Sequence, residues 1–168
     1  QLPVKAGSVR TALLSATLID LNGEAHFLSS ARDITEFKAA ERILCQSEQK
    51  FRSLFESAPD FIHLVDLRGV IQLANPAACR RLGYPADEVT GRPLADFLSP
   101  ESRERFIEQL PELLKKGALR AEYDMVERAG AIIPVDCSAI TVESESDGAY
   151  ILLFQKDITE RRRNERKF

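Results

Sequence analysis

The sequence predicts an α+β fold in which an antiparallel sheet and short helices share one core. The 168 residues are 44% hydrophobic, which is enough for one domain with a real core. Short β-rich runs are joined by tight-turn signals such as Asn22-Gly23. Between other runs lie helix signatures that open on a capping residue and Pro and end at Gly, as at Asn75-Pro76 and Gly83.

Composition and charge exclude several classes of protein. The net charge of -3 and the pI near 5.5 give no overall attraction to nucleic acid or anionic lipid. There is no apolar run of about 18 residues and no signal-peptide pattern, so we expect a soluble segment. Cys45, Cys79 and Cys137 are too far apart for a zinc cluster and odd in number, which favours a reducing cytoplasm.

The chain begins with a hairpin whose end is repeated near the C-terminus. Asp33-Ile34-Thr35-Glu36 recurs as Asp157-Ile158-Thr159-Glu160, and residues 4–19 are similar to residues 126–141. Both copies predict two strands, the first turning at Asn22-Gly23 and the second at Asp147-Gly148. Asp or Thr at a helix N-cap, with Glu beside the positive end of the dipole, makes each copy a strand-to-helix junction.

A helix is predicted over residues 36–56, directly after the first junction. Its apolar positions alternate at spacings of three and four, which is the a/d pattern of a short coiled coil. We therefore expect a homodimer through this helix. The alternative is one amphipathic helix that packs on its own domain. The seam positions are Phe37, Ala40, Leu44, Ser47, Phe51 and Leu54.

The remaining elements follow in a regular order. FIHLVD and VIQLAN read as two short strands, and Asn75-Pro76 then opens a helix that stops at Gly83. Two single helical turns open at Pro85 and Pro93. A longer helix is expected over residues 100–116, followed by a long strand and the second copy of the hairpin.

This order of motifs, over residues 47–160, resembles a PAS domain of bacterial signalling proteins. The resemblance lies in SEQKFRSLFESAPDFIHLVD, in GVIQLANPAACRRLGYPADEVTGRP and in the hairpin that ends in DITE. It implies a five-stranded antiparallel sheet in spatial order 2-1-5-4-3, with short helices over one face and a pocket between them. Helical linkers would flank this domain.

The resemblance also implies a division of the chain. Residues 1–35 would be the C-terminal strands of a preceding PAS domain, and residues 36–56 a linker helix. Residues 57–160 would be a complete PAS domain, and residues 161–168 the start of a signalling helix. The implied function is a sensory or dimerisation module of a protein such as a sensor histidine kinase or diguanylate cyclase. Its output domain would lie downstream in the same chain. The alternative is a ligand-free structural protein-interaction module.

Enzymatic chemistry finds no support in the motifs. His26 and His63 both fall in strand-like runs without a partnered nucleophile, and no phosphate-binding glycine loop is present. We therefore expect no catalytic residue and no metal site. The basic tail after Glu160 lacks interleaved aromatic residues, so we favour a helix start over a nucleic-acid or membrane patch.

Haem and flavin are also disfavoured. Photoreactive flavin members of the PAS family carry Gly-Arg-Asn-Cys where this chain has Gly91-Arg92-Pro93-Leu94, so Leu94 replaces the reactive cysteine. The chain has no Trp to stack on a redox flavin. Haem-binding members use a histidine on the long helix, and residues 100–116 contain none; Met125 or a cysteine would be an unusual ligand.

A small apolar ligand in the pocket remains possible. Strand alternation predicts the side chains that face such a pocket, although the same residues could simply fill the core. Asn75, Tyr123 and Gln155 are its polar candidates, with Asn75 more simply explained as an N-cap. Cys79 and Cys137 are either redox-responsive or structural. The candidates are Ile62, Leu64, Ile71, Leu73, Asn75, Phe97, Phe106, Leu110, Tyr123, Met125, Val135, Cys137, Ile151, Leu153 and Gln155. Signal relay is predicted at Asp157, Ile158, Thr159 and Glu160.

Overall fold

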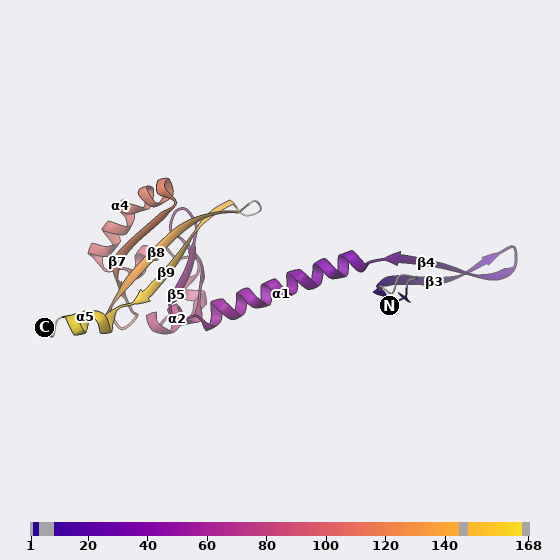
Figure 1. The fold of residues 1–168 in the computed structure, drawn as a ribbon, viewed down its shortest axis with the longest axis horizontal. Helices are drawn as coiled ribbons and strands as arrows, with labels where there is room; N and C mark the ends of the chain where they lie inside the picture. The colour runs from indigo at the N-terminus through magenta and orange to yellow at the C-terminus, as the bar shows by residue number, and fades with distance from the viewer. Residues whose placement is uncertain (1, 4–8, 145–147, 166–168) are drawn as a thin grey trace. The chain divides into compact units, whose positions relative to one another are not determined.

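The computed structural model describes residues 2–3, 9–144 and 148–165. The chain divides into two compact units, Gln1–Arg52 and Ser53–Phe168 (Figure 1). The elements of the first unit are β1 (Leu2–Pro3), β2 (Val9–Arg10), β3 (Ala12–Leu21), β4 (Glu24–Asp33) and most of α1 (Thr35–Ser57), which crosses the boundary.

The first unit contains the predicted hairpin. β3 and β4 pair along their whole length, and Leu21 opposite Glu24 closes the ladder. Asn22 and Gly23 have φ values of 57° and 83°, which is the pair of positive values that a two-residue hairpin turn requires. Asp20 Oδ1 accepts a hydrogen bond from the Gly23 N–H at 3.0 Å and fixes the turn. The turn prediction is therefore confirmed.

Helix α1 matches the prediction for residues 36–56. Asp33 Oδ1 accepts the Thr35 N–H at 2.9 Å, so the residue that ends β4 also starts the helix. The side chains of Phe37, Leu44 and Leu54 are each more than half exposed in the single chain. The predicted a/d seam is therefore available on the helix surface.

The second unit is built on one antiparallel sheet with the order β6-β5-β9-β8-β7 (Figure 1). Numbered within this unit, the order is 2-1-5-4-3, as the resemblance to PAS domains implied. Its strands are β5 (Phe61–Val65), β6 (Ile71–Ala74), β7 (Ala118–Val126), β8 (Ile132–Ser144) and β9 (Gly148–Asp157). Its helices are α2 (Pro76–Leu82), α3 (Ala86–Val89), the 3-10 turn η1 (Leu94–Phe97), α4 (Pro100–Lys116) and α5 (Thr159–Glu165).

Local chemistry sets the bounds of the helices. Ser99 caps α4 by accepting the Ser102 N–H at 3.3 Å, with Pro100 in the first turn. Gly83 and Gly117 end α2 and α4 at φ values of 77° and 78°, where a side chain would be strained. The last register pair of the β8–β9 hairpin joins Ser144 to Gly148, and Asp147 of the predicted turn lies outside the described residues.

The core of this unit lies between the sheet and the helices α2, α3, η1 and α4. Buried strand residues such as Val65 and Ile151 are clustered there with helix residues such as Leu82, Phe97 and Phe106. Burial on this scale is the main source of stability for the unit. Among the described helices, none is both long and apolar enough to cross a membrane.

Candidate functional site: the sheet interior and the helix junction

The interior face of β5 differs from the sequence prediction. Phe61, His63 and Val65 are buried, whereas Ile62 and Leu64 lie half-buried on the opposite face of the strand. Alternation fixes which residues share a face but not which face meets the core. The prediction that Ile62 and Leu64 line the interior was therefore wrong by one residue.

Leu73 is also misplaced in the prediction. In β6, Ile71 is buried opposite Val65, but Leu64 pairs with Leu73, so Gln72 is skipped in the register. Such a bulge moves the following side chain to the other face of the sheet. Leu73 is consequently 46% exposed.

The structure places the other candidates in the interior. They come from η1, α4, four strands of the sheet and the N-cap of α2, and Leu110 is the one that is only partly buried. The buried candidates are Ile71, Asn75, Phe97, Phe106, Tyr123, Met125, Val135, Cys137, Ile151, Leu153 and Gln155.

A small, partly enclosed cavity lies in this interior, between α4 and strands β7, β8 and β9. Its volume is about 10 Å³, roughly the space of one water molecule. The walls are apolar, with Phe106, Leu113, Cys137 and Leu153 among them. In this conformation the side chains fill the space between the sheet and α4 almost completely.

Asn75 is a structural hub at the start of α2. Its Oδ1 accepts the N–H groups of Ala78 and Ile62, both at 3.1 Å. Its Nδ2 donates to the carbonyl oxygens of Asp60 at 2.9 Å and Phe55 at 3.3 Å. All the hydrogen-bonding capacity of this buried amide is used, so Asn75 is an N-cap that also ties α1 and β5 together.

Tyr123 and Cys137 sit beside the cavity. The Tyr123 hydroxyl donates to Gln109 Oε1 at 2.7 Å, and burial raises the pKa of Tyr123 to about 12. Burial also raises the pKa of the Cys137 thiol to about 12, although a contact with Gln155 opposes the rise. A thiol held in its protonated form is a poor nucleophile, so this environment favours the structural alternative for Cys137. Cys79 is half-buried, and burial raises the pKa of its thiol as well.

His63 is the interior residue that sequence reasoning missed. Its Nδ1 lies 2.8 Å from Gln155 Oε1, across the β5–β9 pair, and both side chains are fully buried. Burial lowers the pKa of His63 to about 4, with the Gln155 contact opposing the shift, so the ring is neutral near pH 7. The sequence signal that could have identified it is a single polar residue, His63, within the apolar strand FIHLV.

The described residues do not assemble a metal site. Within the described part of the chain, no three His, Cys, Asp or Glu side chains come close enough to hold a metal ion. Leu94, which stands at the reactive-cysteine position of photoreactive relatives, is buried in η1.

The predicted relay residues form one compact junction at the end of β9. Asp157 Oδ1 accepts hydrogen bonds from the Thr159 N–H at 2.8 Å and the Thr159 hydroxyl at 2.5 Å. Asp157 Oδ2 accepts from Arg81 of α2 at 3.2 Å. Burial raises the pKa of Asp157, but the hydrogen bonds from Thr159 and Arg81 outweigh it and hold the pKa below its ordinary value.

Ile158 anchors this junction, whereas Glu160 is exposed. The Ile158 side chain is buried, its N–H donates to the Pro134 carbonyl at 2.9 Å, and its carbonyl accepts the Arg162 N–H at 2.9 Å. The first junction has the equivalent pattern, because the Ile34 N–H donates to Thr11 and the Ile34 carbonyl accepts the Lys38 N–H. The two copies of DITE thus start their helices in the same way.

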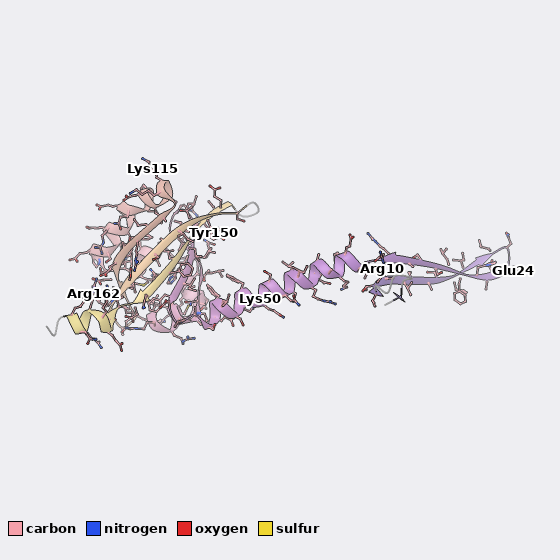
Figure 2. The ribbon with its side chains drawn as sticks, in the orientation of Figure 1. Arg10, Glu24, Lys50, Lys115, Tyr150 and Arg162 are labelled. Carbon is pink, nitrogen blue, oxygen red and sulfur yellow. The ribbon has the colours of Figure 1, made fainter. Side chains whose placement is uncertain are left out.

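A second contact at the junction was not predicted. Arg162, which Figure 2 labels at α5, donates to Asp124 Oδ1 and Glu122 Oε2 of β7, both at 2.9 Å. Arg161 also pairs with Glu122. We name these four residues the β7–α5 clasp. Its partners are about 38 residues apart in the chain, so no local sequence pattern predicts the contact.

Comparison with protein families matches residues 59–160 to the PAS domain. A relative in Bacillus subtilis, sporulation kinase E, is 34% identical over 122 residues, which are 73% of this chain and 16% of the kinase. The methyl sulfide methyltransferase-associated sensor of Methanosarcina acetivorans is 25% identical over 77% of this chain and 13% of the sensor. The chain therefore spans less than a fifth of either relative.

Solved structures show the same likeness. The PAS domain of an HTR-like protein from Haloarcula marismortui superposes with a TM-score of 0.65 at 27% identity, covering 72% of this chain and 99% of that domain. A domain of a sensory box sensor histidine kinase/response regulator from Geobacter sulfurreducens gives 0.57 at 27% identity, over 67% of this chain and 96% of that domain. The strand order, the sheet with its covering helices and the matched residues agree, and the chain belongs to the PAS domain family.

Proposed function

We propose that this PAS domain relays changes in its interior to an output domain that follows α5 in a longer signalling protein. The observation that carries the proposal is the double attachment of α5 to the sheet. Asp157 joins the helix to β9 and to Arg81 of α2, and the β7–α5 clasp joins it to β7. A shift of either contact changes how the helix starts. In this role the domain senses and does not catalyse.

One route runs from α4 to the clasp. The Ser102 hydroxyl on α4 accepts the Asp124 N–H at 2.8 Å, and the Asp124 carbonyl accepts the Ser99 N–H at 2.8 Å. The Asp124 side chain then pairs with Arg162. A movement of the N-terminal end of α4 is thus coupled to the first turns of α5 through one residue.

A second route runs from α2. Arg81 donates to Asp157 at 3.2 Å and to Glu127, at the end of β7, at 2.8 Å. One guanidinium therefore connects the helix over the sheet, the strand β7 and the junction. A planar guanidinium, whose N–H groups point in fixed directions, can bridge two carboxylates in this way better than an ammonium group.

The names of the relatives support the kind of output. One curated relative is a sporulation kinase and another is named a sensor, and a structural neighbour belongs to a sensor histidine kinase. By this likeness we propose a histidine kinase as the output and a cytoplasmic setting for the domain. A cyclase output remains an alternative.

We further propose that α1 pairs with the same helix of a second copy. The a/d positions of Phe37, Leu44, Phe51 and Leu54 form an exposed apolar seam at heptad spacing. A seam of this kind is stabilised when a second helix covers it.

The rival function is a ligand-free interaction module, and two observations favour it. The interior cavity is only about 10 Å³. On the other face of the sheet, Leu73, Leu64, Leu152 and Ile140 are register neighbours across four strands and form a partly exposed apolar row. Such a row could bind a protein partner.

The relay is tested in the full-length parent. Arg162→Gln and Arg81→Gln each remove contacts that hold the start of α5, so we expect either variant to change basal output or the size of the response. Arg163→Gln, on the same helix and exposed, is the matched control. If output and response are unchanged in both variants and circular dichroism shows an intact fold, the relay is rejected and the interaction module is the remaining function.

A further inference from the structure

The outer side of α4 carries an apolar strip that is largely exposed. Ile107, Leu110, Pro111 and Leu114 follow one another at helical spacing, so they share one face of the helix. Ile107 is 56% exposed and Leu114 is 39% exposed, whereas Leu110 is half-buried at the border of the strip. The core is filled from another side of the helix, by residues such as Phe106. The helix is thus apolar on two sides, and the sheet covers one of them.

Pro111 stands at the centre of this strip, where it weakens the helix. Proline has no N–H, so the Ile107 carbonyl loses its ordinary donor, and no residue is less favourable inside a helix. Because Pro111 is exposed, this loss is not offset by packing within the described chain. The short ring projects less than a leucine side chain and lets a second helix approach closely at this point.

A ridge of charged residues borders the strip on one side. Glu104, Glu108 and Lys115 are separated by four and seven residues, which places them on one line along the helix. Among the described residues, none of these three side chains has an ion pair or a hydrogen bond. In contrast, the neighbouring Lys116 pairs with Glu112 of the same helix at 2.5 Å. Figure 2 shows Lys115 extending outward from the C-terminal end of α4.

The apolar strip is complementary to itself when a second α4 lies antiparallel to it. With the centre of the contact between Leu110 and Pro111, each Leu110 lies opposite the Pro111 of the other copy. The same two-fold axis places each Ile107 opposite the Leu114 of the other copy. Both exposed ends of the strip are therefore covered at once.

The charged ridge is complementary in the same arrangement. At 1.5 Å per residue, Lys115 lies about 7 Å from the centre toward the C-terminus, and Glu108 and Glu104 lie about 4 Å and 10 Å toward the N-terminus. The two-fold axis brings each Lys115 to a height between the two carboxylates of the other copy. In a parallel arrangement, like charges would face each other instead.

We propose that this face of α4 binds the same face of a second copy of the chain, antiparallel and about a two-fold axis. The second copy is the occupant because it supplies both the apolar residues and the opposite charges that the face lacks. The contact is much smaller than the roughly 800 Å² per partner of a standard interface, so we expect a dissociation constant on the order of 0.1–1 mM. It is separate from the seam of α1 and does not rest on the proposed relay.

The strength of the contact is measured by sedimentation equilibrium of the whole chain carrying Phe51→Glu, which removes any pairing through α1. We expect its average mass to rise toward that of a dimer as the concentration approaches about 1 mM. Adding Ile107→Glu should weaken this association at least about tenfold, because it buries a charge at two symmetric positions. Adding Ile132→Glu instead, at a residue of β8 that is 59% exposed, should change it less than about twofold.

The antiparallel register is tested by carbodiimide coupling in a mixture of isotope-labelled and unlabelled Phe51→Glu chains. We expect Lys115 to be joined to Glu104 or Glu108 of the other copy, so half of the coupled product should carry one labelled and one unlabelled peptide. The pair of Lys116 and Glu112 lies within one helix and is the internal control. Its product should contain no mixed-isotope species.

Any of three results overturns the contact. They are a Phe51→Glu chain that stays monomeric at about 1 mM, equal weakening by Ile107→Glu and Ile132→Glu, and an absence of coupling between Lys115 and either carboxylate of the other copy. The first and third need no change on α4, so a folding defect in that helix cannot hide them. Because none of these experiments measures output, an inert Arg162→Gln parent would reject the relay and keep the contact.

Discussion

Arg162 Nη1 lies 2.9 Å from Asp124 Oδ1, and this ion pair fastens the helix that leaves the domain to a strand at the edge of the sheet. Asp124 is also bonded through its backbone to Ser99 and Ser102 at the start of α4. One residue therefore contacts the helix that covers the core and the helix that leaves it. The predictions below begin with this pair.

A double-mutant cycle on Arg162→Ala and Asp124→Ala should give a coupling free energy of about 0.5–1 kcal/mol, because both side chains are partly exposed. The coupling should shrink when the salt concentration is raised to about 0.5 M. Urea unfolding followed by tyrosine emission measures it, since Tyr84, Tyr123 and Tyr150 all lie in the second unit. Arg163→Ala with Asp124→Ala is the control cycle, and equal coupling there would contradict a specific clasp.

Replacing Asn75 should destabilise the second unit strongly. Asn75→Ala removes four hydrogen bonds of a buried amide and should lower the free energy of unfolding by about 2–3 kcal/mol. Asn75→Asp keeps the acceptor but turns a carboxylate toward two carbonyls, so it should not restore stability. Ser99→Ala, which removes a cap with one such bond to Ser102, should cost only about 1 kcal/mol. Similar losses in the two alanine variants would refute the hub role.

His63 should make stability depend on pH. Its pKa is about 4 in the folded chain, where burial disfavours the charged ring, against an ordinary value of 6.5 when unfolded. Between these values the unfolded chain binds more protons, so this stabilisation is complete above pH 6.5 and is lost as pH falls toward 4. The loss amounts to about 3 kcal/mol.

Unfolding free energies of the unmodified chain and His63→Leu, measured from pH 7 down to 4, check the size of this effect. The variant should show a shallower slope, with the remainder contributed by carboxylates such as Asp157, whose pKa is held low. His26→Gln, a change at an exposed histidine of the first unit, is the matched control. Parallel slopes for all three chains would show that His63 does not titrate as a buried group.

The seam of α1 predicts the oligomeric state. Phe51→Glu places a charge at an a/d position, so it should shift a dimer to monomer in light scattering across a concentration series. Gln49→Glu adds the same single negative charge outside the seam and should leave the dimer in place. A strict monomer at every concentration in the unmodified chain would reject the dimer.

The local parts of the fold were predictable because local chemistry decides them. The turn at Asn22-Gly23, the cap at Asn75 and the helix ends at Gly83 and Gly117 each depend on one or two residues and their neighbours. The strand order was available from the resemblance to PAS domains. The start of α5 at DITE followed from its capping residues.

The misplaced side chains show where sequence reasoning lacks information. FIHLV is apolar at most positions on both faces, because Ile62 and Leu64 lie on the outer face of the sheet, where Leu64 belongs to the apolar row. His63 therefore looked like the surface residue. Its partner Gln155 lies 92 residues away, and the bulge that turns Leu73 outward exists only in the pairing of two strands. These are long-range facts that one local pattern does not contain.

The clasp has a practical consequence for sensor grafting. The matched PAS region ends at residue 160, one residue before Arg161 and two before Arg162. A chimera joined at that boundary keeps Glu122 and Asp124 but replaces Arg161 and Arg162 with residues of the other protein. The two carboxylates then repel each other without a basic partner. A junction placed after Arg162 keeps all four residues of the β7–α5 clasp in the transplanted domain. At this boundary we expect the domain to control the new output domain.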